Sequence, residues 1–398
     1  MSDPLRVGVN LCWLVPGVVG GSEDLLLGWL GALAAHSETD EQARPIELTL
    51  FGRQELVEAH PWLGDAFPFV GAVLAGRARA RRVLVETGWL VSQQRRHHIE
   101  VMHHAGGVVP LRHRSASVLT VHDIQPLDQP ETFSALKRRY LGFMLPRSVR
   151  TAQVMAVTSD FVVDRLVDRL GAERRRCHVV RPVLRPRPHL VIPAQDQAVR
   201  RRYQIGAHFV LYPAVPYPFK NHRVLYEAMR RLPAEHEAQL VLTGGVGPED
   251  QGLAAFVATH ALQGRILRVG RIPAADYETL LAAADAVVFP SRYEGFGLGA
   301  LDGLAVGAPL LVSDIAPLAE VVGPEGVRIG IHDAATWSAE IDLVTSSPQR
   351  RAELAAASLA RAGCFDARRS AAGLRAAYRA AAAGLASARA GACGPVPR

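Results

Sequence analysis

The chain has 398 residues, of which 49% are hydrophobic and 21% charged, and its formal net charge at pH 7 is +7. This length predicts two or three domains rather than one, and the hydrophobic share is enough to bury a large core. The charge is modest for the length, so it allows anionic partners such as a nucleotide diphosphate or acidic lipid headgroups, and we expect no nucleic-acid partner.

The cysteines and the N-terminal segment indicate a cytoplasmic protein. The cysteines are scattered and form no CxxC pair, which is typical of unpaired thiols in a reducing compartment. The first residues, "MSDPLRVGVNLCWLV", lack the charged-then-apolar pattern of a signal peptide. No apolar segment is long enough to span a bilayer.

In the first half of the chain, short apolar runs alternate with helical patterns. A helix is expected after the glycine-rich segment "PGVVGGSED", and an amphipathic helix over 161–171 stops at Gly171. Strands are expected over 6–14, 46–52, 100–107, 117–123, 152–160 and 177–183.

The second half repeats this alternation after a proline-rich segment, 181–197, which predicts an interdomain linker. Strands are expected over 208–215, 238–245, 266–272, 285–291 and 308–314. Helices are expected over 221–232, 249–262, 274–284 and 298–306, and an alanine-rich helix from about Asp366.

Continuously apolar strands separated by helices predict parallel sheets that are covered on both faces. Two such halves predict an α/β protein with two doubly wound domains. Ligands of these sheets bind at the carboxyl ends of the strands, so we expect a deep cleft where the two carboxyl edges face each other. The residues that directly follow each strand are therefore the candidates for function.

The first candidate is the glycine-rich turn after the first strand, with Gly17, Gly20 and Gly21 before Ser22 and Glu23. Glycines let a loop bring N–H groups close to a ligand, and a helix N-terminus favours an anion. The alternative is a tight turn capped by Ser22 or Glu23. The spacing is not GxGxxG, so no dinucleotide site is predicted.

The second candidate is His122, followed by Asp123, after the strand over 117–123. This histidine could bind a phosphate or a sugar hydroxyl with Asp123 orienting it, or it could be a satisfied histidine at a capped strand end. His103 and His104 end the preceding strand, but the spacings are not those of a metal site, and we expect no metal.

Two further candidates follow strands of the second half. Lys220 and Asn221 stand at a helix start, where a lysine charge and a helix dipole together suit a diphosphate. The alternative is a solvent-exposed lysine near a helix cap. Gly244 and Gly245 end the next strand and could let a nucleotide approach the backbone.

The most informative segment is "SRYEGFGLGALDGLAVGAPLLVSD", residues 291–314. Glu294 lies in a loop after a buried strand, and Asp302 lies one turn into the helix that follows. We expect the N–H groups of Gly295, Phe296, Gly297 and Leu298 to hold phosphate and Glu294 to accept hydrogen bonds from sugar hydroxyls.

This segment resembles the donor-site signature of the retaining glycosyltransferases of family 4, also called glycosyl transferases group 1, which have the GT-B fold. "GGSE", "TVHDIQPLDQPETFS", "AVTSDFV" and "YPAVPYPFKNH" match in order, so the resemblance covers nearly the whole chain. It implies two facing Rossmann-like domains with a deep cleft between them. They are an acceptor-binding domain over 1–190 and a nucleotide-sugar donor domain over 191–365, and a C-terminal helix over 366–398 crosses back to the first domain.

The resemblance also implies roles for the residues. Glu294 would contact the donor sugar, Asp302 the ribose hydroxyls, and Lys220 the diphosphate together with the N–H groups of residues 295–298. His122 would contact the donor sugar or phosphate, and Gly20 and Gly21 the diphosphate or the acceptor.

Two departures from the family pattern matter. The family usually has glutamate at Asp302, and aspartate shortens the reach by about 1.5 Å. The family also often has an arginine a few residues before the lysine, where this chain reads "YPAVPYPFK". One diphosphate charge would then come from elsewhere or be missing.

The resemblance therefore predicts transfer of a hexose, of the mannose or glucose type, from a GDP- or UDP-linked donor to a saccharide, lipid-linked or small-molecule acceptor. The expected transition state is oxocarbenium-like, with the acceptor attacking from the face that the diphosphate leaves, and no cofactor or metal is expected. A nucleotide-sugar epimerase and a non-catalytic nucleotide-sugar-binding protein are the alternatives.

One further segment bears on location. Residues 77–96 combine arginines with an apolar stripe and Trp89, so they could lie on an anionic membrane near a lipid-linked acceptor. The alternative is a helix of the acceptor domain with a solvated basic face.

Overall fold

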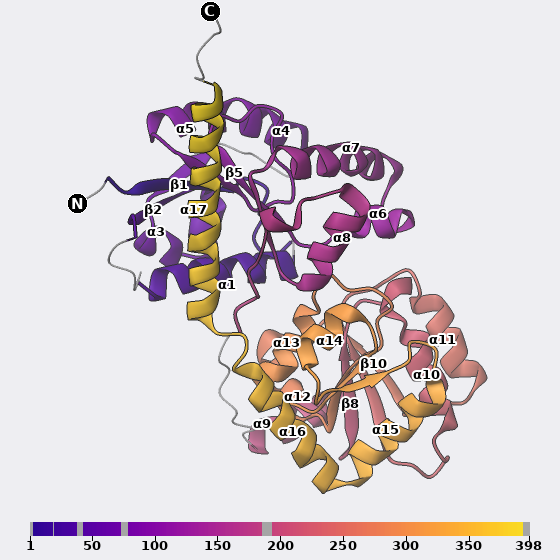
Figure 1. Ribbon diagram of the computed structural model, residues 1–398. Helices are drawn as coiled ribbons and strands as arrows, with labels where there is room; N and C mark the ends of the chain where they lie inside the picture. The colour runs from indigo at the N-terminus through magenta and orange to yellow at the C-terminus, as the bar shows by residue number, and fades with distance from the viewer. Residues whose placement is uncertain (1–2, 19, 38–42, 73–78, 185–192, 393–398) are drawn as a thin grey trace, which may run out of the picture. The chain divides into compact units, whose positions relative to one another are not determined.

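The computed structural model describes residues 3–18, 20–37, 43–72, 79–184 and 193–392. The chain forms two compact units. Unit 1 joins the N-terminal part up to Val183 with the segment that begins at Asp366, and unit 2 runs from Leu184 to Phe365. Each unit is one parallel sheet with helices (Figure 1).

The sheet of unit 1 has seven strands in the order β3-β2-β1-β4-β5-β6-β7, and every described pair is parallel. The order reverses between β1 and β4, which makes this the topological switch point. The strands are β1 (Leu5–Leu11), β2 (Ile46–Arg53), β3 (Phe69–Ala72), β4 (Val101–His104), β5 (Ala116–Val121), β6 (Val154–Val157) and β7 (Cys177–Val179).

Helices cover this sheet. The C-terminal helix α17 contacts α1 and strands β4 to β7, so the end of the chain completes unit 1 (Figure 1, yellow). The helices of unit 1 are α1 (Gly21–Ala35), α2 (Gln54–Ala59), α3 (Trp62–Ala66), α4 (Arg79–Thr87), α5 (Trp89–Arg96), α6 (Gln125–Asp128), α7 (Ala135–Thr151), α8 (Asp160–Leu170) and α17 (Ala367–Ala392), with 3₁₀ turns η1 (Pro130–Thr132) and η2 (Arg174–Arg176).

The sheet of unit 2 has six parallel strands in the order β10-β9-β8-β11-β12-β13, with its switch point between β8 and β11. Its strands are β8 (Phe209–Pro213), β9 (Gln239–Thr243), β10 (Ile266–Gly270), β11 (Ala286–Phe289), β12 (Leu310–Ser313) and β13 (Val327–Ile329). Strands β11 and β12 are buried along their whole length, as strands covered on both faces must be.

The helices of unit 2 alternate with these strands. They are α9 (Pro193–Tyr203), η3 (Pro218–Lys220), α10 (His222–Arg231), α11 (Asp250–Thr259), α12 (Ala274–Ala283), α13 (Leu298–Ala305), α14 (Ala316–Val322), α15 (Ala334–Ser346) and α16 (Pro348–Ala362). The predicted alternation of strands and helices is confirmed, and so is the pair of parallel α/β sheets.

The predicted bounds need correction in two places. The strand predicted over 6–14 ends at Leu11, because Cys12 and Leu14 are buried in a turn rather than in the sheet. The linker predicted over 181–197 contains the start of helix α9 at Pro193, a proline position that the first turn of a helix accepts. Residues 185–192 of that linker lie outside the described residues.

The segment 77–96 is two helices rather than one. Leu90 of α5 is fully buried and Trp89 packs edge-on against Phe51, with ring centroids 6.2 Å apart. Leu84 of α4 is 70% exposed. Most of the predicted apolar stripe that the structure describes therefore belongs to the core of unit 1. Residues 77 and 78 lie outside the described part of the chain.

Candidate functional site

The switch point of unit 2 carries the strongest candidate site. Strands β8 and β11 are neighbours there, Lys220 follows β8 and Glu294 follows β11. The carboxyl ends of adjacent parallel strands meet at one edge of the sheet, so two residues far apart in sequence converge. The sequence placed both residues after strands, and the strand order explains why they meet.

Lys220 and Glu294 form an ion pair. The Lys220 ammonium donates to Glu294 Oε1 over 2.6 Å, and the Ser291 hydroxyl donates to the same oxygen over 2.7 Å. The two charged side chains are 23% and 12% exposed, so each would lose stabilisation if the other were removed. An incoming anion would compete with Glu294 for the Lys220 ammonium.

Asn221 ties the loops of this edge together. Its side-chain amide donates to the carbonyls of Pro290 (2.9 Å) and Ile331 (2.8 Å), and its Oδ1 accepts from Arg292 Nε over 3.2 Å. The residue is 2% exposed and has a positive φ of 55°. The side-chain amide of Asn221 is engaged within the loops of this edge, so it positions them, and donor binding by Asn221 stays a prediction.

The glycine-rich turn before α13 brings backbone N–H groups to the same edge. Gly297 has a φ of 101°, and a Cβ there would lie 2.6 Å from the side chain of Leu318, so only glycine fits. The N–H groups in the first turn of a helix have no partner within that helix and favour an anion. Leu298 begins α13 and contributes one of them.

Phe296, in the same turn, differs from its neighbours because its side chain belongs to the core. It is 4% exposed and its ring lies edge-on to Phe365, with centroids 5.9 Å apart. Of the predicted phosphate-binding residues 295–298, Phe296 can therefore contribute through its backbone alone.

Asp302 lies on α13, and the Tyr277 hydroxyl of α12 donates to its Oδ2 over 3.3 Å. The side chain is half-buried. The tyrosine was not predicted as part of the site, because nothing in the sequence pairs α12 with α13.

Gly244 and Gly245 follow β9. Gly244 has a φ of 121°, and a Cβ there would lie 2.9 Å from the carbonyl carbon of Ala214. Packing against the loop after β8 is thus one reason for glycine at 244, and the predicted approach of a nucleotide to Gly244 and Gly245 stays a prediction. Arg268 donates to the carbonyls of both glycines and to Asp250.

Arg271 is a cation at this edge that sequence reasoning missed. Its guanidinium would lie 3.4 Å from a Cβ built on Gly245, and the residue is exposed. It ends the stretch "ILRVGR", which we read as a plain strand. The position directly after a strand was the signal that could have found it.

Unit 1 places His122 beside Trp13, with ring centroids 5.9 Å apart. His122 Nε2 donates to the carbonyl of Ala105 over 2.9 Å, which leaves Nδ1 as an acceptor. Nδ1 of His122 and Nε1 of Trp13 are buried and have no hydrogen-bond partner within the described residues. Burial lowers the pKa of His122, so the ring is neutral at pH 7.

Glu23 holds the glycine-rich turn of unit 1 in place through two contacts. Glu23 accepts from the Gly17 N–H over 2.8 Å and contacts His60 Nε2 over 3.1 Å. Gly20 has a φ of 62° and Gly21 begins α1. These three predicted residues, His122, Gly20 and Gly21, belong to unit 1, whereas the other predicted site residues belong to unit 2.

The remaining site predictions concern a metal and a membrane span. No three histidine, cysteine or acidic side chains of the described residues lie together in a way that could hold a metal ion. None of the described helices combines the length and the hydropathy that crossing a bilayer requires.

Comparison with known proteins adds to this geometry. Residues 198–360, which lie within unit 2, match the family model "Glycosyl transferases group 1". O-antigen chain mannosyltransferase B of Escherichia coli is 33% identical over 58% of the chain and 62% of its own length, so the chain spans less than two thirds of that relative. D-inositol 3-phosphate glycosyltransferase of Streptosporangium roseum is 27% identical over 82% of the chain and 69% of its own length.

Two solved structures show the fold. HepE from Anabaena, solved in complex with UDP and glucose, has a TM-score of 0.67 at 18% identity and covers 96% of this chain and 100% of its own. Sucrose-phosphate synthase from Thermosynechococcus elongatus has a TM-score of 0.72 at 19% identity and covers 94% and 98%. The predicted GT-B fold, built from two Rossmann-like units, is confirmed.

Proposed function

We propose that this protein is a retaining glycosyltransferase of family 4. It moves a hexose, of the mannose or glucose type, from a GDP- or UDP-linked donor to a saccharide, lipid-linked or small-molecule acceptor. Its role is in the synthesis of cell-surface polysaccharide or another glycoconjugate. The observation that carries the proposal is the Lys220–Glu294 pair at the switch point of unit 2, beside the turn that begins α13.

The named relatives support this reading. A group 1 glycosyltransferase model matches the part of the chain that carries Lys220 and Glu294, and one relative is named as a mannosyltransferase. The structurally similar HepE was solved with UDP and glucose, which are the two halves of one candidate donor. The donor, the acceptor, retention and the cytoplasmic location all belong to the proposal.

In the proposed mechanism, the Lys220 ammonium leaves Glu294 and binds the diphosphate of the donor. The ammonium and the N–H groups at the start of α13 then stabilise the negative charge that grows on the diphosphate as the sugar–phosphate bond breaks. Lys220 is one of only two lysines in a chain that otherwise uses arginine, and its ammonium acts as a compact point charge. This arrangement supplies the charge compensation without a metal or a cofactor.

Glu294, released from Lys220, accepts hydrogen bonds from the donor sugar hydroxyls. Asp302 accepts hydrogen bonds from the ribose hydroxyls, and Tyr277 orients its carboxylate. Arg271, exposed after β10, is our candidate for the diphosphate charge that the family often draws from an arginine before the lysine.

The oxocarbenium-like sugar is attacked from the face that the diphosphate leaves, and the diphosphate accepts the acceptor's proton. His122 contributes as a neutral ring whose Nδ1 can accept a hydrogen bond from a sugar hydroxyl. Gly20 and Gly21 would lie near the diphosphate or the acceptor, and the interdomain cleft stays a prediction.

The membrane contact also stays a prediction. The inward packing of Trp89 and Leu90 favours the alternative, an acceptor-domain helix whose basic face is solvated.

The proposal is tested by incubating the protein with GDP- and UDP-linked hexoses and measuring release of the nucleoside diphosphate and transfer to a supplied acceptor. Glu294→Gln and Lys220→Met should each lower kcat by about 10²-fold or more, because each removes a group that acts on the transition state. Lys220→Arg should restore part of the loss, since the charge returns on a longer side chain.

Glu325→Gln is the matched control, because Glu325 is an exposed acid of the same unit. Near-normal transfer by Glu294→Gln or Lys220→Met would overturn the site assignment. Conversion of one nucleotide sugar into another without release of the diphosphate would show an epimerase. Binding without either reaction would show a non-catalytic protein.

A further inference from the structure

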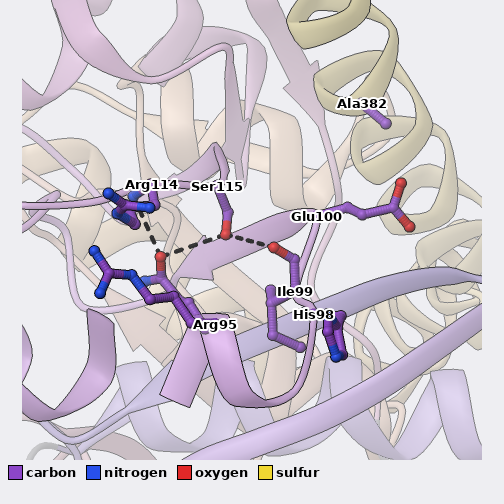
Figure 2. A pocket seen from close by; sticks show the side chains of 8 residues that line it. Arg95, His98, Ile99, Glu100, Arg114, Ser115 and Ala382 are labelled. Carbon is purple, nitrogen blue, oxygen red and sulfur yellow. Dashed lines mark hydrogen bonds between the residues drawn. The ribbon is translucent and has the colours of Figure 1, made fainter. Parts of the chain in front are cut away.

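Unit 1 contains a cavity of about 360 Å³ that is separate from the edges described above. It lies at the amino ends of β4 and β5, because Glu100 directly precedes β4 and Ser115 directly precedes β5. The switch-point residues lie at the opposite, carboxyl edge of this sheet. Ala382 of α17 forms part of the wall (Figure 2).

The floor of the cavity holds a buried amide group with a free donor. Gln94 is 3% exposed, and its Oε1 accepts from the backbone N–H of Arg114 over 3.3 Å. This N–H can only donate, so the amide must keep its oxygen toward Arg114. Gln94 Nε2 is then left buried without a hydrogen-bond partner in the described part of the chain.

An unpartnered buried donor is costly and rare in native proteins. The cost disappears when a water or a ligand accepts from it. Gln94 lines the cavity, but Nε2 is covered by surrounding atoms, so an acceptor bound there reaches it only when the amide turns toward the cavity.

The rim of the cavity is positively charged. Arg95 lies in the last turn of α5 and Arg114 lies in the loop before β5, and Figure 2 shows both side chains on the same side of the cavity. Neither guanidinium has an ion pair among the described residues. Glu100 is the acidic residue that lines the cavity, and the Arg44 guanidinium donates to its two carboxylate oxygens over 2.6 and 3.0 Å. His98 adds a further ring donor at the rim.

We propose that this cavity binds a small molecule through its phosphate group. Two guanidinium forks from separate elements suit the several oxygens of a phosphate, and the buried amide of Gln94 lines the same cavity. The volume exceeds what one phosphate fills and lies within the ordinary range of small-molecule sites. The proposal is independent of the proposed transferase activity.

Binding is measured by calorimetry on the full chain, with inorganic phosphate and glycerol 3-phosphate as probes at constant ionic strength. The Lys220→Met variant serves as the background, so that phosphate binding near Lys220 does not contribute. Arg95→Ala and Arg114→Ala should each weaken binding about tenfold or more, because each removes a charge-assisted hydrogen bond.

Gln94→Glu is the sharper variant. It keeps an oxygen for the Arg114 N–H but replaces the amide nitrogen with a carboxylate oxygen that repels phosphate, so binding should be lost. Circular dichroism checks that the buried acid leaves the fold intact. Arg96→Ala is the matched control, because Arg96 is the next residue of α5, carries the same charge and does not line the cavity.

Equal affinity in the parent and the Arg95→Ala/Arg114→Ala double variant would overturn the proposal. So would an equal loss in Arg96→Ala, which would mean that only the overall charge matters. Binding to vesicles of phosphatidylcholine and phosphatidylglycerol in equal amounts, without binding of either soluble probe, would also overturn it in favour of a surface for lipid headgroups.

Discussion

The orientation of Glu294 depends on two hydrogen-bond donors, Lys220 and Ser291. Glu294 Oε1 holds both the Lys220 ammonium and the Ser291 hydroxyl, so the acid is already oriented before a ligand arrives. Ser291 is the last buried residue before the loop and was not predicted, because a serine at a strand end is common. A pre-oriented group loses less entropy on binding, which favours the ligand.

A second residue, His104, makes the stability of unit 1 depend on pH. His104 ends β4, is fully buried, and both of its ring nitrogens lack a partner within the described residues. Burial, together with the neighbouring His113 and His103, lowers the pKa of its imidazole to about 3.

The direction of the pH effect follows from this lowered pKa. Between pH 6.5 and about 3 the unfolded chain binds a proton at His104 that the folded chain does not bind, so stability falls as the pH falls. This histidine alone should cost about 1.4 kcal/mol of unfolding free energy per pH unit in that range.

Replacing His104 by leucine should therefore reduce the loss of stability between about pH 7 and about pH 5 by about 1 to 2 kcal/mol. Near pH 7 the variant should be at least as stable as the parent, because an unpartnered polar ring is replaced by an apolar side chain. Urea unfolding at both pH values measures this. His332→Leu, at an exposed histidine, is the control, and an equal pH slope in the parent and His104→Leu would contradict the prediction.

At the scale of elements, the apolar runs predicted the strands that the sheet order later brought together. Two edge strands were missed, because Gly71 interrupts β3 and Arg328 interrupts β13, so neither shows a continuous apolar run. The sequence could not reveal that β8 and β11 are neighbours, because strand order depends on crossovers that no local pattern encodes. The meeting of Lys220 with Glu294 was therefore implied by the family resemblance rather than by local pattern.

The β9–α11 loop offers a test of why glycine is needed. Gly244→Ala should lower the unfolding free energy by about 1 to 3 kcal/mol, because φ is positive and the new Cβ would meet the backbone of Ala214. Gly252→Ala, in α11, should raise it by up to about 1 kcal/mol, since nothing lies within 4 Å of the added Cβ and alanine favours the helix. Urea midpoints with unchanged m-values measure both effects, and equal effects of the two changes would contradict the explanation.

For the whole molecule, the two units differ in how the chain builds them. Unit 2 is one continuous segment, whereas unit 1 is closed by α17, which arrives more than 180 residues after β7. Leu374, Ala377, Tyr378 and Ala381 of α17 are buried, and the Tyr378 hydroxyl contacts His103 Nδ1 over 3.0 Å. The first unit therefore lacks part of its core until α17 is made.

A chain that ends at Phe365 should keep a cooperative unfolding transition for unit 2 and lose the one for unit 1. Each large buried side chain removed from a core costs about 2 to 5 kcal/mol, and losing several exceeds the usual margin of domain stability. Tryptophan fluorescence separates the units, because Trp337 is the tryptophan of unit 2 and its replacement by phenylalanine silences that signal.

Tyr378→Phe in the full chain is the milder counterpart. It removes one buried hydrogen bond to His103, so it should destabilise unit 1 by about 1 to 2 kcal/mol and leave the transition of unit 2 unchanged. If the chain ending at Phe365 kept both transitions, α17 would be an accessory to unit 1 rather than part of its core. If Tyr378→Phe shifted both transitions together, the two units would unfold as one, and the division into separately stable units would fail.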